Sequence, residues 1–78
     1  MLKFKMVEEK QDIIKYEYYP EGKEACGIVS INKVTGEMEL VKQAENDRRG
    51  NYARKMFGRI LKMLQAGTFD EAGMIAWY

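Results

Sequence analysis

Apolar and polar residues alternate with a period of two along the first half of the chain. Leu2, Phe4 and Met6 are separated by lysines, a pattern typical of a half-buried β-strand. A segment rich in β-branched and aromatic residues and two further apolar segments follow. We therefore expect four strands before residue 43, at 2–6, 13–19, 25–31 and 37–42.

Three polar or glycine-containing stretches separate these strands. The polar residues Glu8–Gln11 predict a first turn. Pro20–Lys23 combines a proline, which presets φ, with a glycine that accepts positive φ. In Asn32–Gly36 the asparagine can cap the turn and the glycine can close a hairpin. Short connections of this kind favour a meander of antiparallel strands.

The pattern changes to a helical period after residue 47. A helix is expected from about Arg48 to Ala66, with Asn46 or Asp47 as N-cap and Gly67 just beyond its end. A start nearer Gly50 is the alternative, because arginines at 48 and 49 oppose the helix dipole. The predicted apolar stripe contains Ala53, Met56, Phe57, Ile60, Leu61 and Leu64, flanked by Tyr52 and Met63.

The apolar ending, residues 74–78, predicts a fifth strand. After a four-strand meander, the helix returns the chain so that the last strand can pair antiparallel with the first. The prediction is thus a single α+β domain over residues 1–78. It has a curled antiparallel sheet in the order 5-1-2-3-4, counted along the chain, with one amphipathic helix packed on one face.

This arrangement leaves more apolar residues than one helix can cover. If Phe4, Tyr16, Tyr18, Ile31 and Leu40 face the helix, another apolar set is left for the opposite face. Strong curling of the sheet could bury part of that set. Alternatively, the set forms an interface, most simply that of a homodimer. The candidate interface residues are Val7, Ile13, Tyr19, Ile28 and Val41.

The amino-acid composition argues against many functional classes for this protein. The chain has one cysteine and no histidine, so the usual structural zinc site and the usual general base are missing. Glu17, Glu37 and Glu39 could lie on one sheet face and hold a hard cation, although a solvated face explains them equally. A reactive Cys26 would need electropositive neighbours, which the adjacent sequence lacks, so a small buried residue is expected. No cofactor, metal site or small-molecule substrate is predicted.

Charge is distributed unevenly along the chain. The net charge is +1 overall, but −3 for residues 1–47 and +4 for residues 48–78. The expected helix carries a cationic stripe with no acidic residue from 48 to 69. Such a stripe could contact nucleic-acid phosphates or an acidic partner, or could simply be a solvated face. Its residues are Arg48, Arg54, Lys55, Arg59 and Lys62.

Several short segments resemble those of uncharacterised proteins from Gram-positive bacteria and their prophages. They are Tyr18–Gly22, Gly27–Ile31, Thr35–Glu37 and Gly73–Tyr78. Each marks a turn or a strand rather than a functional motif. The resemblance implies a small intracellular accessory protein, and it brings no activity, cofactor or site.

These observations favour a non-enzymatic protein-interaction module, with self-association through its sheet as one option and a partner protein or a second copy as its ligand. Nucleic-acid binding through the helix stripe is the alternative. A cytoplasmic location is expected from the lone cysteine and the absence of a signal-peptide pattern. No apolar run is long enough to span a membrane.

Overall fold

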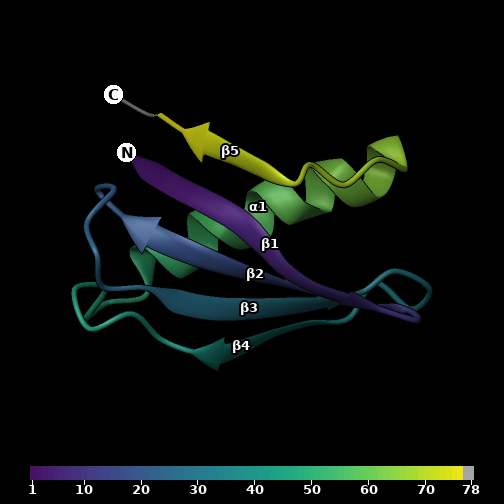
Figure 1. The fold of residues 1–78 in the computed structure, drawn as a ribbon, viewed down its shortest axis with the longest axis horizontal. Helices are drawn as coiled ribbons and strands as arrows, with labels where there is room; N and C mark the ends of the chain where they lie inside the picture. Colours follow the sequence, from purple (N-terminus) through teal and green to yellow (C-terminus); the bar gives the residue numbers. More distant parts are fainter. Residues whose placement is uncertain (77–78) are drawn as a thin grey trace.

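The computed structural model describes residues 1–76, in which a five-stranded antiparallel sheet carries one helix. The sheet order is β4-β3-β2-β1-β5, which is the predicted order (Figure 1). The predicted strand at residues 74–78 begins earlier and ends at Ile75; residues 77–78 lie outside the described part. The elements are β1 Leu2–Lys10, β2 Ile13–Pro20, β3 Gly27–Asn32, β4 Met38–Lys42, α1 Asn51–Ala66 and β5 Ala72–Ile75.

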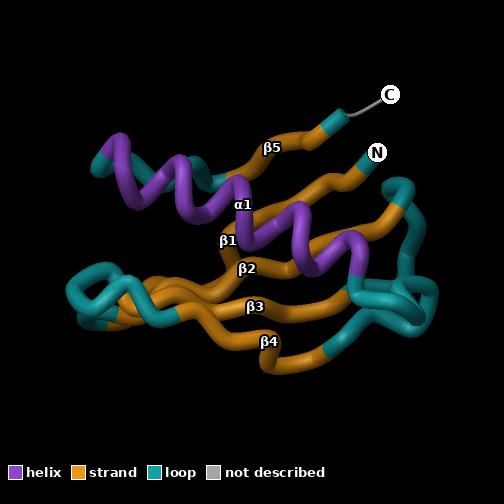
Figure 2. Tube along the Cα trace, turned by 180° about the vertical axis from the view of Figure 1, so that it is seen from behind, coloured by secondary structure: helices purple, strands orange, loops and turns teal. Residues whose placement is uncertain are grey.

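The prediction of a curled sheet was wrong. The sheet is not strongly curled, and α1 lies across one of its faces (Figure 2). A 16-residue helix supplies enough apolar surface to close the core from one side. The opposite face carries charged side chains that are stable in water, so nothing forces the sheet to close around it.

The core lies between the helix and the inner face of the sheet. Phe4, Tyr16, Tyr18 and Ile31 are buried there, as predicted, and Leu40 is partly buried. The rings of Phe4 and Tyr16 meet edge to face, with centroids 5.6 Å apart, a favourable arrangement for aromatic pairs.

Two strand glycines lie opposite aromatic residues that cover them. Gly27 is paired with Tyr18, and Gly73 with Phe4. A Cβ atom on Gly27 would stand 2.2 Å from the Tyr18 ring, and one on Gly73 would stand 2.6 Å from Phe4 Cζ. Each ring therefore lies flat over its neighbouring strand only because no side chain is there.

The turn after β1 is shorter than predicted. β1 continues to Lys10, and only Gln11 and Asp12 separate it from β2. Gln11 takes a positive φ of 54°, which a tight hairpin requires. The Asn32–Gly36 turn is confirmed: the Asn32 side-chain oxygen accepts hydrogen bonds from the backbone N–H of Val34 and of Thr35.

The helix begins at Asn51, so the alternative start near Gly50 is the correct one and the start at Arg48 was wrong. Gly50 occupies the N-cap position with a φ of 72° and provides no side-chain cap. The predicted cap residue, Asp47, nevertheless caps the helix from outside it. Its carboxylate accepts hydrogen bonds from the backbone N–H of Tyr52 at 3.1 Å and of Ala53 at 2.9 Å. Gly67 follows the last turn in a left-handed conformation, as predicted.

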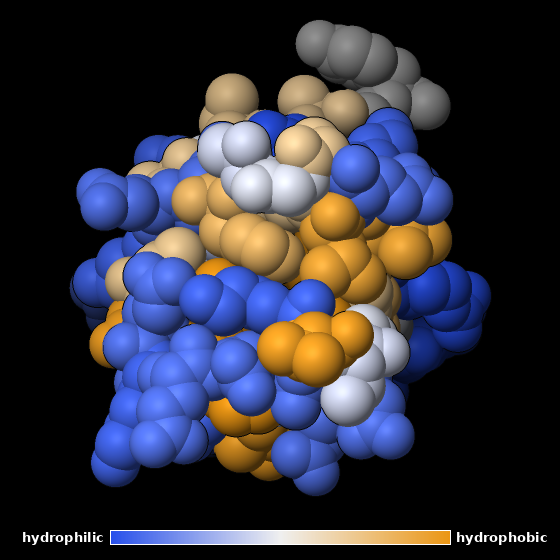
Figure 3. Space-filling view, turned by 90° about the vertical axis from the view of Figure 1, so that its right-hand side faces the viewer, coloured by the Kyte–Doolittle hydropathy of each residue, from blue (hydrophilic) through white to orange (hydrophobic). Residues whose placement is uncertain are grey.

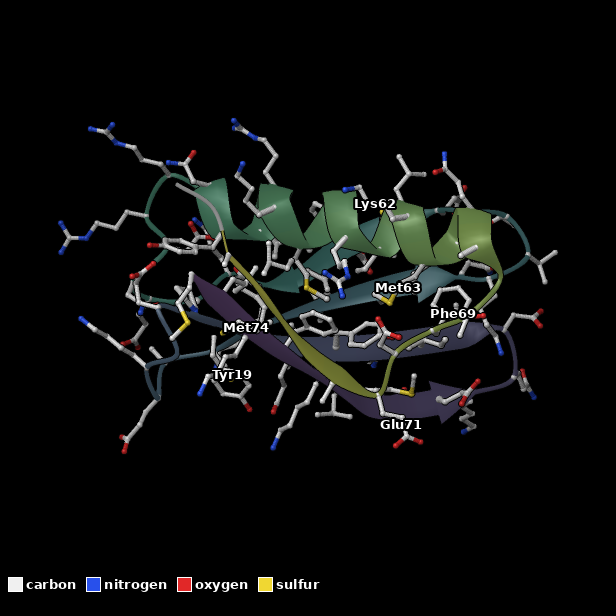
Figure 4. All side chains as sticks on the ribbon, turned by 90° about the horizontal axis from the view of Figure 1, so that it is seen from above. Tyr19, Lys62, Met63, Phe69, Glu71 and Met74 are labelled. Carbon is white, nitrogen blue, oxygen red and sulfur yellow. The ribbon has the colours of Figure 1, made fainter. Side chains whose placement is uncertain are left out.

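The buried stripe of α1 is rotated relative to the prediction. Met63, expected on the flank, is buried with Ala53, Met56 and Ile60, whereas Leu61 is 47% exposed. Met63 points toward the sheet, and Lys62 lies on the surface of the helix (Figure 4). The Met63 sulfur accepts a hydrogen bond from the Asp70 N–H and lies 3.7 Å from the Tyr16 hydroxyl oxygen, contacts that a helical wheel does not contain.

Candidate binding surface on the helix

The structure brings four of the five predicted basic residues to one place. Arg54, Lys55, Arg59 and Lys62 line a hollow of about 440 Å³ between α1 and the end of β5. The remaining lining residues are Gly58, Ile75 and Ala76. The hollow therefore has cationic walls and an apolar floor.

Arg59 is held by contacts with two other elements of the fold. Its guanidinium group lies 3.5 Å from the Asp70 carboxylate and stands over the Phe4 ring, 5.5 Å from its centroid. The aromatic face and the carboxylate both favour a cation at this position. Arg59 thus joins the helix to β1 and to the segment before β5, and it supports the floor of the hollow.

The connection between α1 and β5 is also anchored from the core. The Tyr16 hydroxyl donates a hydrogen bond of 2.7 Å to the Asp70 carbonyl oxygen. Burial, and then the nearby charges of Asp70 and Glu9, raise the pKa of Tyr16 to about 12. The neutral hydroxyl that holds the connection is therefore the stable form at all physiological pH values.

Gly58 lies in the middle of α1, where glycine costs roughly 1 kcal/mol relative to alanine. Apart from its chain neighbours and the surrounding helix backbone, no atom lies within 4 Å of the position that its Cβ would take. Packing therefore does not require a glycine here. Because Gly58 has no side chain, the cationic hollow stays open at this position.

Arg48, the fifth predicted residue, lies elsewhere. It precedes the helix and lines a different hollow with Arg49, Asn51 and Tyr52. Beside it, the buried Asp47 caps the helix and accepts a hydrogen bond of 3.3 Å from the Tyr18 hydroxyl. This polar group is fully paired inside the protein, so it is a structural support rather than a ligand site.

Charged residues lie among the predicted interface residues of the sheet, and two of these, Ile13 and Val41, line one hollow with Glu8, Lys10, Lys15 and Glu39. Tyr19 is paired with Lys3, Ile13 with Lys10, and Ile28 with Glu17 and Lys42. All three apolar side chains are partly buried. Each thus stands beside charged residues on the outer face.

Ion pairs divide this outer face further. Lys5 lies 3.8 Å from Glu17, and Lys15 lies 3.6 Å from Glu8. The Tyr19 hydroxyl donates a hydrogen bond to Glu17. That bond, with some burial, raises the pKa of Tyr19 to about 12. On the outer face of the sheet, single apolar side chains are therefore separated by paired charges.

Val7 and Val41 are the extra residues at two β-bulges. The pairing of β1 with β2 shifts between Met6 and Glu8, and that of β3 with β4 shifts beside Val41. Val7 is 45% exposed and Val41 47% exposed. A bulge re-aims its side chain and bends the strand, so period-two counting could not place either residue.

Apolar side chains are also exposed in the β3–β4 turn and on α1. Apolar side chains reach solvent among charged ones at the end of the molecule seen in Figure 3. Val34 in the β3–β4 turn is 74% exposed, and Leu61 on α1, predicted to be in the core, is 47% exposed. Helical periodicity alone does not show which of the residues beside the apolar stripe the sheet covers.

The described residues contain no cluster of three or more potential metal ligands. Glu17 is paired with Lys5 and Tyr19, and Glu39 is paired with Ser30 in the ladder. Cys26 is only partly buried and precedes β3, so its expected place inside a buried strand was wrong.

No family model, no curated protein and no solved structure matches this chain. The resemblance to Gram-positive and prophage proteins therefore stays a prediction. Within residues 1–76, no helix has the length and apolar character needed to cross a membrane.

Proposed function

We propose that this protein is a small non-catalytic interaction module that binds an acidic partner protein through the basic face of α1. The observation that supports this function is the gathering of Arg54, Lys55, Arg59 and Lys62 around one hollow with an apolar floor. Cationic walls attract carboxylates, and the floor offers apolar contact. Most interfaces need both, since charge steers association and apolar burial adds affinity.

The outer face of the sheet supports self-association less well. Its apolar residues are separated by the Lys5–Glu17 and Lys15–Glu8 pairs. Homodimer interfaces are generally more apolar than that. A dimer formed through this face would have to desolvate both ion pairs. The free energy needed to desolvate them exceeds the stabilisation that exposed ion pairs provide.

The biological setting follows from the resemblance and from the single thiol. A cytoplasmic accessory protein of a bacterium or its prophage fits a chain with one unpaired cysteine. In that setting the module would act by holding another protein rather than by transforming a substrate.

The test compares two variants with equal loss of charge. In the first, Arg54, Lys55 and Lys62 become Gln; Arg59 is kept because it supports the fold. In the second, Lys3, Lys5 and Lys42 on β1 and β4 become Gln. Binding of a labelled poly-glutamate peptide is measured by fluorescence anisotropy at several salt concentrations. We expect the first variant to lose at least tenfold in affinity and the second to change less than twofold.

A deoxythymidine oligonucleotide serves as the second probe. If it binds more tightly than the peptide, with affinity that falls steeply as salt rises, nucleic acid is the ligand and the proposal fails. Equal losses in both charge variants would also overturn the proposal, because binding would then depend on net charge and not on the helix surface.

A further inference from the structure

The free edge of β5 presents backbone groups that nothing in its ladder uses. The Met6 N–H donates to the Glu71 carbonyl oxygen at 2.7 Å, so residues 6 and 71 form a hydrogen-bonded pair. Such pairs alternate along an antiparallel ladder. The next ones are therefore Phe4 with Gly73 and Leu2 with Ile75. Between them, the N–H and C=O groups of Ala72 and Met74 point away from β1, toward the open edge.

This edge lacks the devices that normally prevent strand addition. β5 has the sequence Ala-Gly-Met-Ile, with no charge, no proline and no bulge. Within residues 1–76, the feature of β5 that limits strand addition is its length of four residues. The opposite edge, β4, carries Glu39, Lys42 and a bulge at Val41, which are established ways of discouraging edge pairing.

The unprotected edge and the cationic hollow are adjacent. Ile75, the last residue of β5, lines the hollow together with Arg54 and Lys55. Ile75 packs against the core on the helix side of the sheet. Met74, 53% exposed, lies on the other side with Tyr19 (Figure 4). A strand added beyond β5 would therefore have every second side chain on the side of the sheet that carries α1, next to the hollow that Ile75 lines.

We propose that the partner binds as a sixth strand on β5, through an extended segment with an acidic residue at every second position. This inference rests on the proposed function and specifies its binding mode. Alternate side chains of a strand repeat about every 6.8 Å, whereas Lys55 and Lys62 are separated along the helix by about 10 Å. Two or three carboxylates of one strand thus fall within the range of the basic residues. The backbone bonds supply affinity and the carboxylates supply selectivity.

Charge argues against a second copy of this chain as the occupant. Pairing β5 with β5 would place two basic helix faces side by side, and like charges at an interface are strongly unfavourable. A nucleic-acid strand fits the edge less well. Its phosphodiester backbone has no donor for the outward carbonyl groups, and none of the described residues lining the hollow is aromatic.

The first experiment uses an acetylated and amidated peptide of alternating Glu and Val residues. Its control is the same peptide with every valine N-methylated, which keeps the charges and removes backbone donors. Met74→Pro removes one outward N–H while leaving the ladder to β1 intact, because proline is tolerated at an edge where its nitrogen faces solvent. Met74→Ala is the matched variant that keeps the N–H.

We expect saturable binding of the unmethylated peptide and at least a tenfold loss of affinity in Met74→Pro. Met74→Ala should stay within threefold of the wild type, and the methylated peptide should bind at least tenfold more weakly. Hydrogen exchange gives the direct readout. The Ala72 and Met74 amides should exchange at least tenfold more slowly with peptide bound, while amides of β4 are unchanged.

Failure of this inference is distinguishable from failure of the proposed function. If Met74→Pro and the methylated peptide bind normally while the Arg54, Lys55 and Lys62 variant does not, the basic face binds acids without strand addition. The sixth-strand mode is then overturned and the function stands. If no peptide shows saturable binding up to millimolar concentration, both proposals are overturned.

Discussion

The two edges of the sheet are built by different means. β4 is joined to β3 by a short turn in which Asn32 and Gly36 provide the hydrogen bonds and the positive φ. β5 reaches its place after the helix and pairs with β1, the strand most distant from it in sequence. Local turn chemistry therefore specifies one edge, whereas packing across the whole domain specifies the other.

The edges also differ in how they meet solvent. β4 carries charges and a bulge, and β5 carries neither. The charged residues and the bulge of β4 discourage strand addition, so this edge does not depend on a partner. An undefended edge beside a basic hollow is a place where a partner strand gains both backbone bonds and ion pairs. The following predictions test this contrast, beginning with the largest effect.

Gly73→Ala should destabilise the protein by roughly 2–3 kcal/mol through overpacking. The new Cβ would stand 2.6 Å from Phe4 Cζ, so the ring or β5 has to move. Chemical denaturation measures the free energy of unfolding, and amide exchange should accelerate in β5 but not in β4. Phe4→Leu provides the control: adding Gly73→Ala to it should cost clearly less, and additive costs would contradict the proposed clash.

Alkaline pH should weaken the β5 side of the molecule first. The pKa of Tyr16 is raised from 10.0 to about 12, mainly by burial. Its contribution is complete below pH 10 and is lost as the pH rises through about 12. A rise of this size in the pKa of Tyr16 corresponds to a loss of stability on the order of 3 kcal/mol at most. Urea unfolding at pH 8, 10 and 11.5 should show this decline.

Tyr16→Phe is the control for that decline. It removes the titrating hydroxyl and its hydrogen bond to the Asp70 carbonyl, at a cost of about 1–2 kcal/mol at neutral pH. Its stability should fall less than that of the wild type between pH 10 and pH 11.5. An identical decline in both proteins would show that Tyr16 is not the group responsible.

Asn32→Ala should cost about 1 kcal/mol and affect the β4 edge. The substitution removes the acceptor for the N–H groups of Val34 and Thr35, a loss similar to that of a helix cap. Exchange should accelerate in β4 while β5 keeps its protection. Equal acceleration of exchange at both edges would mean that they unfold as one unit. The two edges would then differ in structure but not in local stability.

Gly58→Ala should have the smallest effect, a stabilisation of up to about 1 kcal/mol. The site has room for a Cβ, and alanine is the better helix former. Thermal unfolding measures this gain. Because the methyl group enters the cationic hollow, peptide binding should weaken about threefold or more at the same time. Stabilisation with unchanged binding would show that the hollow does not have to be open.

The sequence alone was sufficient for the elements that depend on local chemistry. Alternation predicted the strands, the turn residues predicted their connections, and the charge pattern predicted the basic stripe of α1. The strand order followed from short connections and from the helix that returns the chain. These features depend on side-chain types and on neighbours within a few positions, so they can be read from the printed residues.

The tertiary structure decided whatever depends on distant neighbours. The bulges at Val7 and Val41 move two residues away from their expected positions. Met63 replaces Leu61 in the core, where its sulfur contacts Tyr16 and Asp70. Arg48 is separated from the other basic residues because the helix starts after Gly50. The pairing of β5 with β1 was expected from the strand order, but only the packing of α1 on the sheet decided that four basic residues meet Ile75 and Ala76 in one hollow.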